Sequence, residues 1–84
     1  MKQIKEFEQI PEIDVEVIKS VLASMKLEDV ALACKGTSPD NTAYIAKLYE
    51  GNALDEAIKS LGAVRIADIE KQQIDIINKI NEQL

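Results

Sequence analysis

Glycine and proline divide this chain into short stretches, and that division limits the folds open to it more than any other feature. The 84 residues contain 3 Gly and 2 Pro, and each lies beside a run in which aliphatic residues recur at helical spacing. No stretch shows the alternation of apolar and polar residues that is typical of a strand. The sequence therefore predicts an all-α fold, a compact bundle of about five to six short helices joined by tight loops.

Five segments are predicted to be helical from this spacing, each bounded by a capping residue, a proline or a glycine. They span residues 14–25, 27–35, 39–49, 53–61 and 66–83. No linker or low-complexity stretch separates them, and a chain of this length is typical of one small domain. We therefore expect a single domain over residues 1–84.

The first residues carry a weaker helical signal. Residues 1–9, MKQIKEFEQ, are largely polar, with Ile4 and Phe7 three positions apart. They are predicted either to form one or two helical turns or to fray. Pro11 is expected to end this segment, because proline lacks the backbone N–H that a helix uses.

Residues that start and stop helices are recognisable at several boundaries. Asp14 and Ser38 are predicted N-caps, because their side-chain oxygens can accept from free backbone N–H groups of the first turn. Asn52 is expected to cap the segment 53–61, with Asp55 completing a partial capping box. Gly36 occupies the place of a glycine that ends a helix in the left-handed conformation.

The last predicted helix carries an aliphatic stripe that should face the core. Gln73 interrupts the stripe, while Ile74 and Tyr44 lie off the main apolar faces and are candidates for exposed apolar contacts. The residues of the stripe are Ile66, Ile69, Ile76, Ile77 and Ile80.

Catalytic machinery is not expected. The chain has no histidine, so it offers neither the commonest general base nor a Ser-His or Cys-His nucleophile pair. Its single cysteine, Cys34, lies on an apolar helix face and is predicted to be a buried packing residue. No glycine-rich phosphate loop and no metal-ligand spacing is present. The sequence therefore predicts no catalytic, cofactor or metal site, and a protein that is not an enzyme.

The net charge and the hydropathy of the chain limit the kinds of partner that it is expected to bind. The formal net charge is −5, which argues against nucleic acid and against an anionic membrane surface, because both attract basic proteins. No apolar run is long enough to span a bilayer. The expected location is the cytoplasm, and the expected partner is another protein.

Arg65, the single arginine, follows a Gly-Ala turn and precedes a predicted helix, where a cation is disfavoured by the helix dipole. A salt bridge to Asp68 would compensate at little net gain. A carboxylate on a partner would compensate with bidentate bonds that lysine cannot form. The residues alone leave these alternatives open.

Three stretches in this order resemble the C-terminal domain family of the bacterial flagellar motor switch protein FliG: FEQIPEIDVEVIKSVLASM (7–25), VALACKGTS (30–38) and LGAVRIADIEKQQIDIINKI (61–80). The resemblance implies a bundle of six short helices at the end of an armadillo-like superhelix, without enzymatic activity. It also implies a place in the cytoplasm, peripheral to the inner membrane at the flagellar basal body. The implied partners are the cytoplasmic loop of the stator and the other switch proteins.

The resemblance also implies three charged contact residues. Lys35 matches the lysine of the family's Lys-Gly step, Glu56 matches the first of two consecutive acids, and Arg65 matches the arginine of the Gly-Pro-Val-Arg step. The second acid is replaced by Ala57, the proline by Ala63, and the preceding hinge motif survives only as IKEF. These departures keep an alternative open, a stand-alone or repurposed adaptor or self-associating module with no role in motility.

Overall fold

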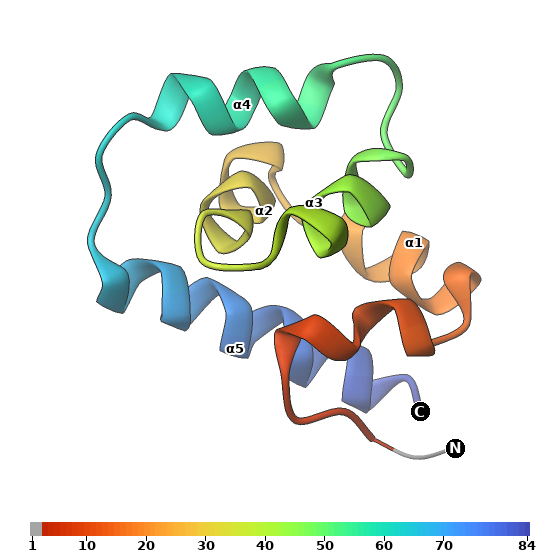
Figure 1. The fold of residues 1–84 in the computed structure, drawn as a ribbon. Coiled ribbons are helices and arrows are strands. Elements are labelled where there is room, and N and C mark those ends of the chain that lie inside the picture. The colour runs from red at the N-terminus through yellow and green to blue at the C-terminus, as the bar shows by residue number, and fades with distance from the viewer. Residues whose placement is uncertain (1–2) are drawn as a thin grey trace.

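Six short helices make up most of residues 3–84, the part of the chain that this computed structural model describes (Figure 1). The first is a 3₁₀ helix, η1, and the other five are α-helices. Their bounds are η1 Phe7–Glu12, α1 Val15–Ala23, α2 Leu27–Cys34, α3 Pro39–Ala46, α4 Ala53–Leu61 and α5 Ile66–Glu82. The predicted all-α bundle is confirmed, and no strand occurs in the described residues.

Helix α2 forms the centre of the domain. It packs mainly against α4 and α5, and Figure 1 shows it between these two helices. Its buried side chains are small, namely Val30, Ala31, Ala33 and Cys34. Short side chains let neighbouring helix backbones approach closely, so α2 can be covered by α4 on one side and by α5 on another.

The aliphatic face of α5 differs from the predicted stripe at its start. Ile69, Ile76 and Ile80 are buried, but Ile66 is 73% exposed. The prediction for Ile66 was wrong because helical spacing alone does not show that this first residue of α5, directly after the connecting loop, is left uncovered by the other helices. Gln73 lies within the stripe because its amide nitrogen donates to the carbonyl oxygens of Ala33 (2.9 Å) and Gly36 (3.1 Å) at the end of α2.

Gly36 has a different role from the predicted one. Its backbone is not left-handed, whereas Gly51 and Gly62 have φ of 55° and 62°. A Cβ at Gly36 would lie 2.7 Å from Cγ2 of Ile69. Glycine is therefore needed here because α5 packs directly against the end of α2, and the local sequence gave no sign of this contact.

The N-terminal segment is ordered onto the bundle over its described residues. Ile4, Phe7 and Ile10 are buried, and the backbone N–H and C=O of Ile4 both bond to the side chain of Asn81, each at 2.9 Å. Pro11 was predicted to end this segment, and that prediction was wrong, because Pro11 lies inside η1. The six-residue 3₁₀ helix continues past the proline to Glu12, and the N–H of Ile13 bonds to the carbonyl of Ile10 at its end.

Two predicted N-caps are confirmed and one is wrong. The carboxylate of Asp14 accepts from the N–H of Glu16 (2.9 Å), and the hydroxyl of Ser38 accepts from the N–H of Asn41 (3.1 Å). Asn52 makes no side-chain capping bond at the start of α4. Its backbone follows directly from the turn at Gly51, which already sets the entry into the helix.

Helix α3 is shorter than predicted, ending at Ala46 instead of residue 49. The N–H groups of Leu48 and Tyr49 bond to the carbonyls of Ile45 and Ala46, three residues earlier. The chain thus tightens into 3₁₀-type turns at the end of the helix, a common way to satisfy the last carbonyls.

Glu8 links η1 to the start of α3. Its carboxylate accepts from the backbone N–H of Ser38 (3.0 Å), the hydroxyl of Ser38 (2.7 Å) and the hydroxyl of Thr37 (2.7 Å). The backbone bond from Ser38 is the main cause that lowers the pKa of Glu8, followed by the two hydroxyl bonds. The negative charge of Glu8 therefore stabilises the docking of the N-terminal segment.

We expect Glu8→Gln to destabilise the domain at neutral pH and to lose this effect in acid. Because the pKa is lower in the folded state, the carboxylate stabilises the fold above the unfolded-state pKa and ceases to do so as pH falls through the folded-state pKa. The difference should stay within about 1 kcal/mol because the carboxylate is exposed. Urea unfolding of the unmodified domain and of Glu8→Gln, from neutral pH down to below the folded-state pKa of Glu8, measures this difference in stability. Glu12→Gln, at an exposed residue, is the control. A difference independent of pH would contradict it.

Candidate functional site

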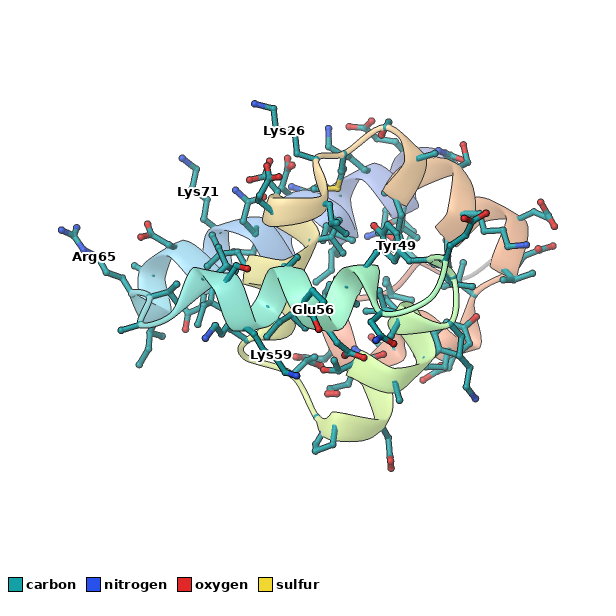
Figure 2. All side chains as sticks on the ribbon, turned by 90° about the horizontal axis from the view of Figure 1, so that it is seen from above. Lys26, Tyr49, Glu56, Lys59, Arg65 and Lys71 are labelled. Atoms are coloured by element: carbon teal, nitrogen blue, oxygen red, sulfur yellow. The ribbon has the colours of Figure 1, made fainter. Side chains whose placement is uncertain are left out.

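Arg65 immediately precedes α5 and is its N-cap residue. Figure 2 shows its side chain at one end of the molecule, pointing away from the ribbon. It forms no ion pair with Asp68, because the salt bridge found within residues 3–84 joins Lys79 and Asp75, with Nζ and Oδ2 4.0 Å apart. The first of the two alternatives for Arg65 is thus excluded in this structure. The guanidinium is an exposed charge without a charged partner among the described residues.

Lys35 lies just past the end of α2, and its ammonium has a specific partner. Nζ donates to the carbonyl oxygen of Gly62, 2.6 Å away. Gly62 ends α4 and begins the connection that leads to Arg65. The structure therefore brings Lys35 to the base of the segment that carries Arg65. Sequence reasoning missed this contact, because 27 positions separate the two residues and nothing local links them.

Glu56 lies in the first turn of α4 and is exposed. Figure 2 shows Glu56 and Lys59 along α4, with Arg65 well beyond the end of that helix. No hydrogen bond or ion pair within residues 3–84 joins Glu56 to Lys35 or Arg65. The three predicted contact residues thus lie at three separate places, namely the end of α2, the first turn of α4 and the residue before α5, and they do not form a connected cluster.

The neighbour of Glu56 explains one departure from the family pattern. Ala57 is half-buried and packs against the hydrophobic core. A carboxylate there would lose part of its hydration without gaining a partner, which is costly. Alanine at this position keeps the inner face of α4 apolar, so the charged surface of α4 depends on Glu56 and the other outward residues.

Two grooves open at the surface near these charges. One, of about 510 Å³, lies where α2, α4 and α5 meet, next to Arg65. Its lining residues are Leu32, Leu61, Ala63, Val64, Arg65 and Asp68. The other, of about 620 Å³, lies between α2, α3 and α4, with Lys35 and Asp55 among its lining residues. Both have largely apolar walls with charges beside them.

Cys34 is a packing residue, as predicted. It is buried, and this desolvation raises the pKa of its thiol to about 12. The thiol therefore stays protonated and is a poor nucleophile. Tyr49 lies nearby, and burial followed by the influence of Cys34 raises the pKa of its phenol.

The exposed apolar side chains differ in part from those predicted. Ile74 is 57% exposed, as its place off the stripe indicated. Tyr44 is half-buried and packs against the core, so the prediction of an exposed contact there was wrong. Ile66 adds an exposed apolar residue directly after Arg65, which the periodicity had placed in the core.

Residues 3–84 contain neither a candidate metal site nor a candidate membrane-spanning helix. Within residues 3–84, no three His, Cys, Asp or Glu side chains come together in a way that could hold a metal ion. None of the helices described is long and apolar enough to cross a membrane.

The fold and these surface features define a small all-α domain with exposed charged side chains beside two largely apolar grooves. The comparisons with known proteins agree with this class. The chain belongs to the FliG C-terminal domain family, whose model matches residues 1–83. It is 36% identical over 77 residues to the flagellar motor switch protein FliG of Thermotoga maritima. That match covers 88% of this chain and 23% of the relative, so the chain spans about a quarter of the relative's length.

Proposed function

We propose that this domain is part of the rotor of a bacterial flagellar motor and contacts the stator's cytoplasmic loop through Lys35, Glu56 and Arg65. Membership of the FliG C-terminal domain family and the identity to a flagellar motor switch protein support the role in the motor. In this role the domain would work in the cytoplasm at the flagellar base, beside the other switch proteins, and would transmit force without catalysing a reaction.

The exposed guanidinium of Arg65 is the observation that carries the stator contact. A cation at a helix N-terminus faces the positive end of the helix dipole, which costs stability. No intramolecular ion pair offsets this cost in residues 3–84. A residue that is unfavourable for the fold and free on the surface is best explained by a partner, and a carboxylate is the partner that a guanidinium binds in bidentate geometry.

Lys35 fits the proposal in a double role. One N–H of its ammonium is used by the carbonyl of Gly62, and the other two remain for a partner. Lys35 would thus both hold the connection that leads to Arg65 and add positive charge beside it. Glu56 offers the opposite charge on α4, so a partner bearing both signs would be oriented as it docks.

We expect Arg65→Glu to weaken binding of a peptide with the sequence of the stator's cytoplasmic loop by about tenfold or more at low salt. The helical circular dichroism signal should not change, because the side chain of Arg65 is exposed and makes no ion pair within residues 3–84. NMR titration of the labelled domain at low and high salt measures the effect, with Lys71→Glu, an exposed charge change on α5, as the control. Equal binding by Arg65→Glu and the unmodified domain would contradict the assigned role.

A second candidate function rests on the exposed isoleucines of α5. Ile66 is 73% and Ile74 57% exposed, and apolar side chains on a surface favour association with a protein. The domain would then be a stand-alone adaptor or a self-associating module without a motility role. Light scattering over a range of concentrations separates the two proposals, since a self-associating module increases in mass with concentration and a monomeric rotor domain does not.

A further inference from the structure

The groove beside Arg65 has aliphatic walls, which a purely electrostatic contact would not require. Leu32 from α2, Leu61 from the last turn of α4 and Val64 from the connecting loop form its walls, and all three side chains are only partly covered. Partly exposed aliphatic side chains that converge from separate elements gain free energy when another apolar side chain covers them.

One positive and one negative side chain line the groove. Arg65 and Asp68 both line it, one turn of helix apart, without pairing. A carboxylate is attracted to the guanidinium of Arg65 and repelled by Asp68, whereas backbone N–H groups or a cation are attracted to Asp68. A bound segment would therefore have one preferred direction.

The size of the groove fits a short segment. Its volume of about 510 Å³ lies within the range of about 300–1,000 Å³ that is typical of sites for small ligands. A second copy of the domain is disfavoured as the occupant, because two copies that each have a net charge of −5 repel each other more strongly than one copy repels a short peptide with a single carboxylate.

We propose that this groove binds an acidic peptide segment in which an aliphatic side chain is adjacent to a carboxylate. The aliphatic side chain packs between Leu32, Leu61 and Val64, while the carboxylate binds the guanidinium of Arg65. The bond from Lys35 to the carbonyl of Gly62 fixes the wall that Ala63 and Val64 provide. This deepens the proposed function, since it makes recognition of the stator loop depend on one apolar residue as well as on charge.

The test uses a blocked peptide, acetyl-Gly-Ser-Leu-Glu-Ser-Gly-amide, titrated into the labelled domain up to about 5 mM while amide shifts are followed by NMR. Shifts should centre on Leu32, Leu61, Val64 and Arg65. Matched peptides with Ser in place of Leu, or Gln in place of Glu, should each bind about fivefold more weakly or worse. Equal binding of the Ser peptide, shifts confined to the groove beside Lys35 and Asp55, or no shifts would overturn the proposal.

A variant of the domain gives an independent arm. Val64→Ser should weaken binding of the Leu-Glu peptide about threefold or more, whereas Val15→Ser should not, since it changes a valine on α1 that is 37% exposed. Equal effects of both variants would contradict the proposal.

The same titration separates this inference from the proposed function. If the stator-loop peptide binds at Arg65 but replacing its aliphatic residues with serine changes nothing, the groove inference is wrong and the stator contact stands. If the Leu-Glu peptide binds in the groove while the stator loop does not bind at all, the proposed function is wrong and the groove inference stands.

Discussion

Ile76→Ala is expected to lower the free energy of unfolding by about 2–5 kcal/mol. Ile76 lies in α5 and is fully buried, at 0% exposure. Removing three carbon atoms from a side chain in this position loses their burial and leaves a cavity that the short surrounding helices can fill only in part. Since small domains are held by only about 5–15 kcal/mol in total, this is a large fraction of the stability.

Urea unfolding followed by far-UV circular dichroism measures this effect. Ile74→Ala is the matched control, because it is the same substitution in the same helix at a residue that is 57% exposed. Its effect should stay within about 0.5 kcal/mol. Similar losses for both variants would mean that helix propensity, and not burial against the other helices, determines how α5 contributes to stability.

Gly36→Ala is expected to destabilise the domain by about 1–3 kcal/mol. The new Cβ would lie 2.7 Å from Cγ2 of Ile69, closer than real Cβ contacts allow. That methyl group is on a β-branched side chain with few rotamers in a helix, so it cannot move aside easily. The strain should instead push α5 away from α2 and weaken the bonds from Gln73 to the carbonyls of Ala33 and Gly36.

A double-mutant cycle tests the cause of this effect. Ile69→Ala removes the methyl group that would collide, at the cost of lost packing. In that background Gly36→Ala should have little further effect on the free energy of unfolding, which gives a coupling of about 1–3 kcal/mol. Simple additivity of the two substitutions would show that the glycine is required for another reason, such as the amide nitrogen of Gln73, which would lie 3.4 Å from the new Cβ.

The position of Gly36 also relates stability to the proposed contact surface. It directly follows Lys35, whose ammonium bonds to the carbonyl of Gly62. Gly62 is bonded to Lys35 at the end of α2, and Arg65 leads directly into α5. A shift of α5 relative to α2 would therefore change the position of Arg65 relative to Gly62. The close packing at Gly36 therefore contributes to the placement of Arg65, although the two residues are far apart in the chain.

The helices themselves could be predicted because their signals are local. Asp14 and Ser38 cap the helices that follow them, since an N-cap bond spans only two or three residues. The burial of Cys34 follows from its place on an apolar helix face. Family membership was also predictable, because the stretches at residues 30–38 and 61–80 resemble the family's motifs and follow each other in the same order, and the family model matches residues 1–83.

The prediction of the candidate site was less complete. The sequence and its family resemblance named Lys35, Glu56 and Arg65, and their roles remain a proposal. It gave no indication that Lys35 bonds to Gly62, or that Leu32, Leu61 and Val64 form a groove beside Arg65. The sequence could not show these features, because each of them brings together residues from helices that are far apart in the chain.

The sequence by itself thus determined an all-α domain, most of its helix starts, its family and the charges that it offers to a partner. Only the tertiary structure decided that Ile66 is exposed, that Gly36 is a packing residue and that Arg65 does not pair with Asp68. It also placed Glu8 on Ser38, 30 positions away. The reason is physical, because caps and periodicity act within a few residues, whereas burial and pairing depend on which helix ends meet when the chain closes on itself.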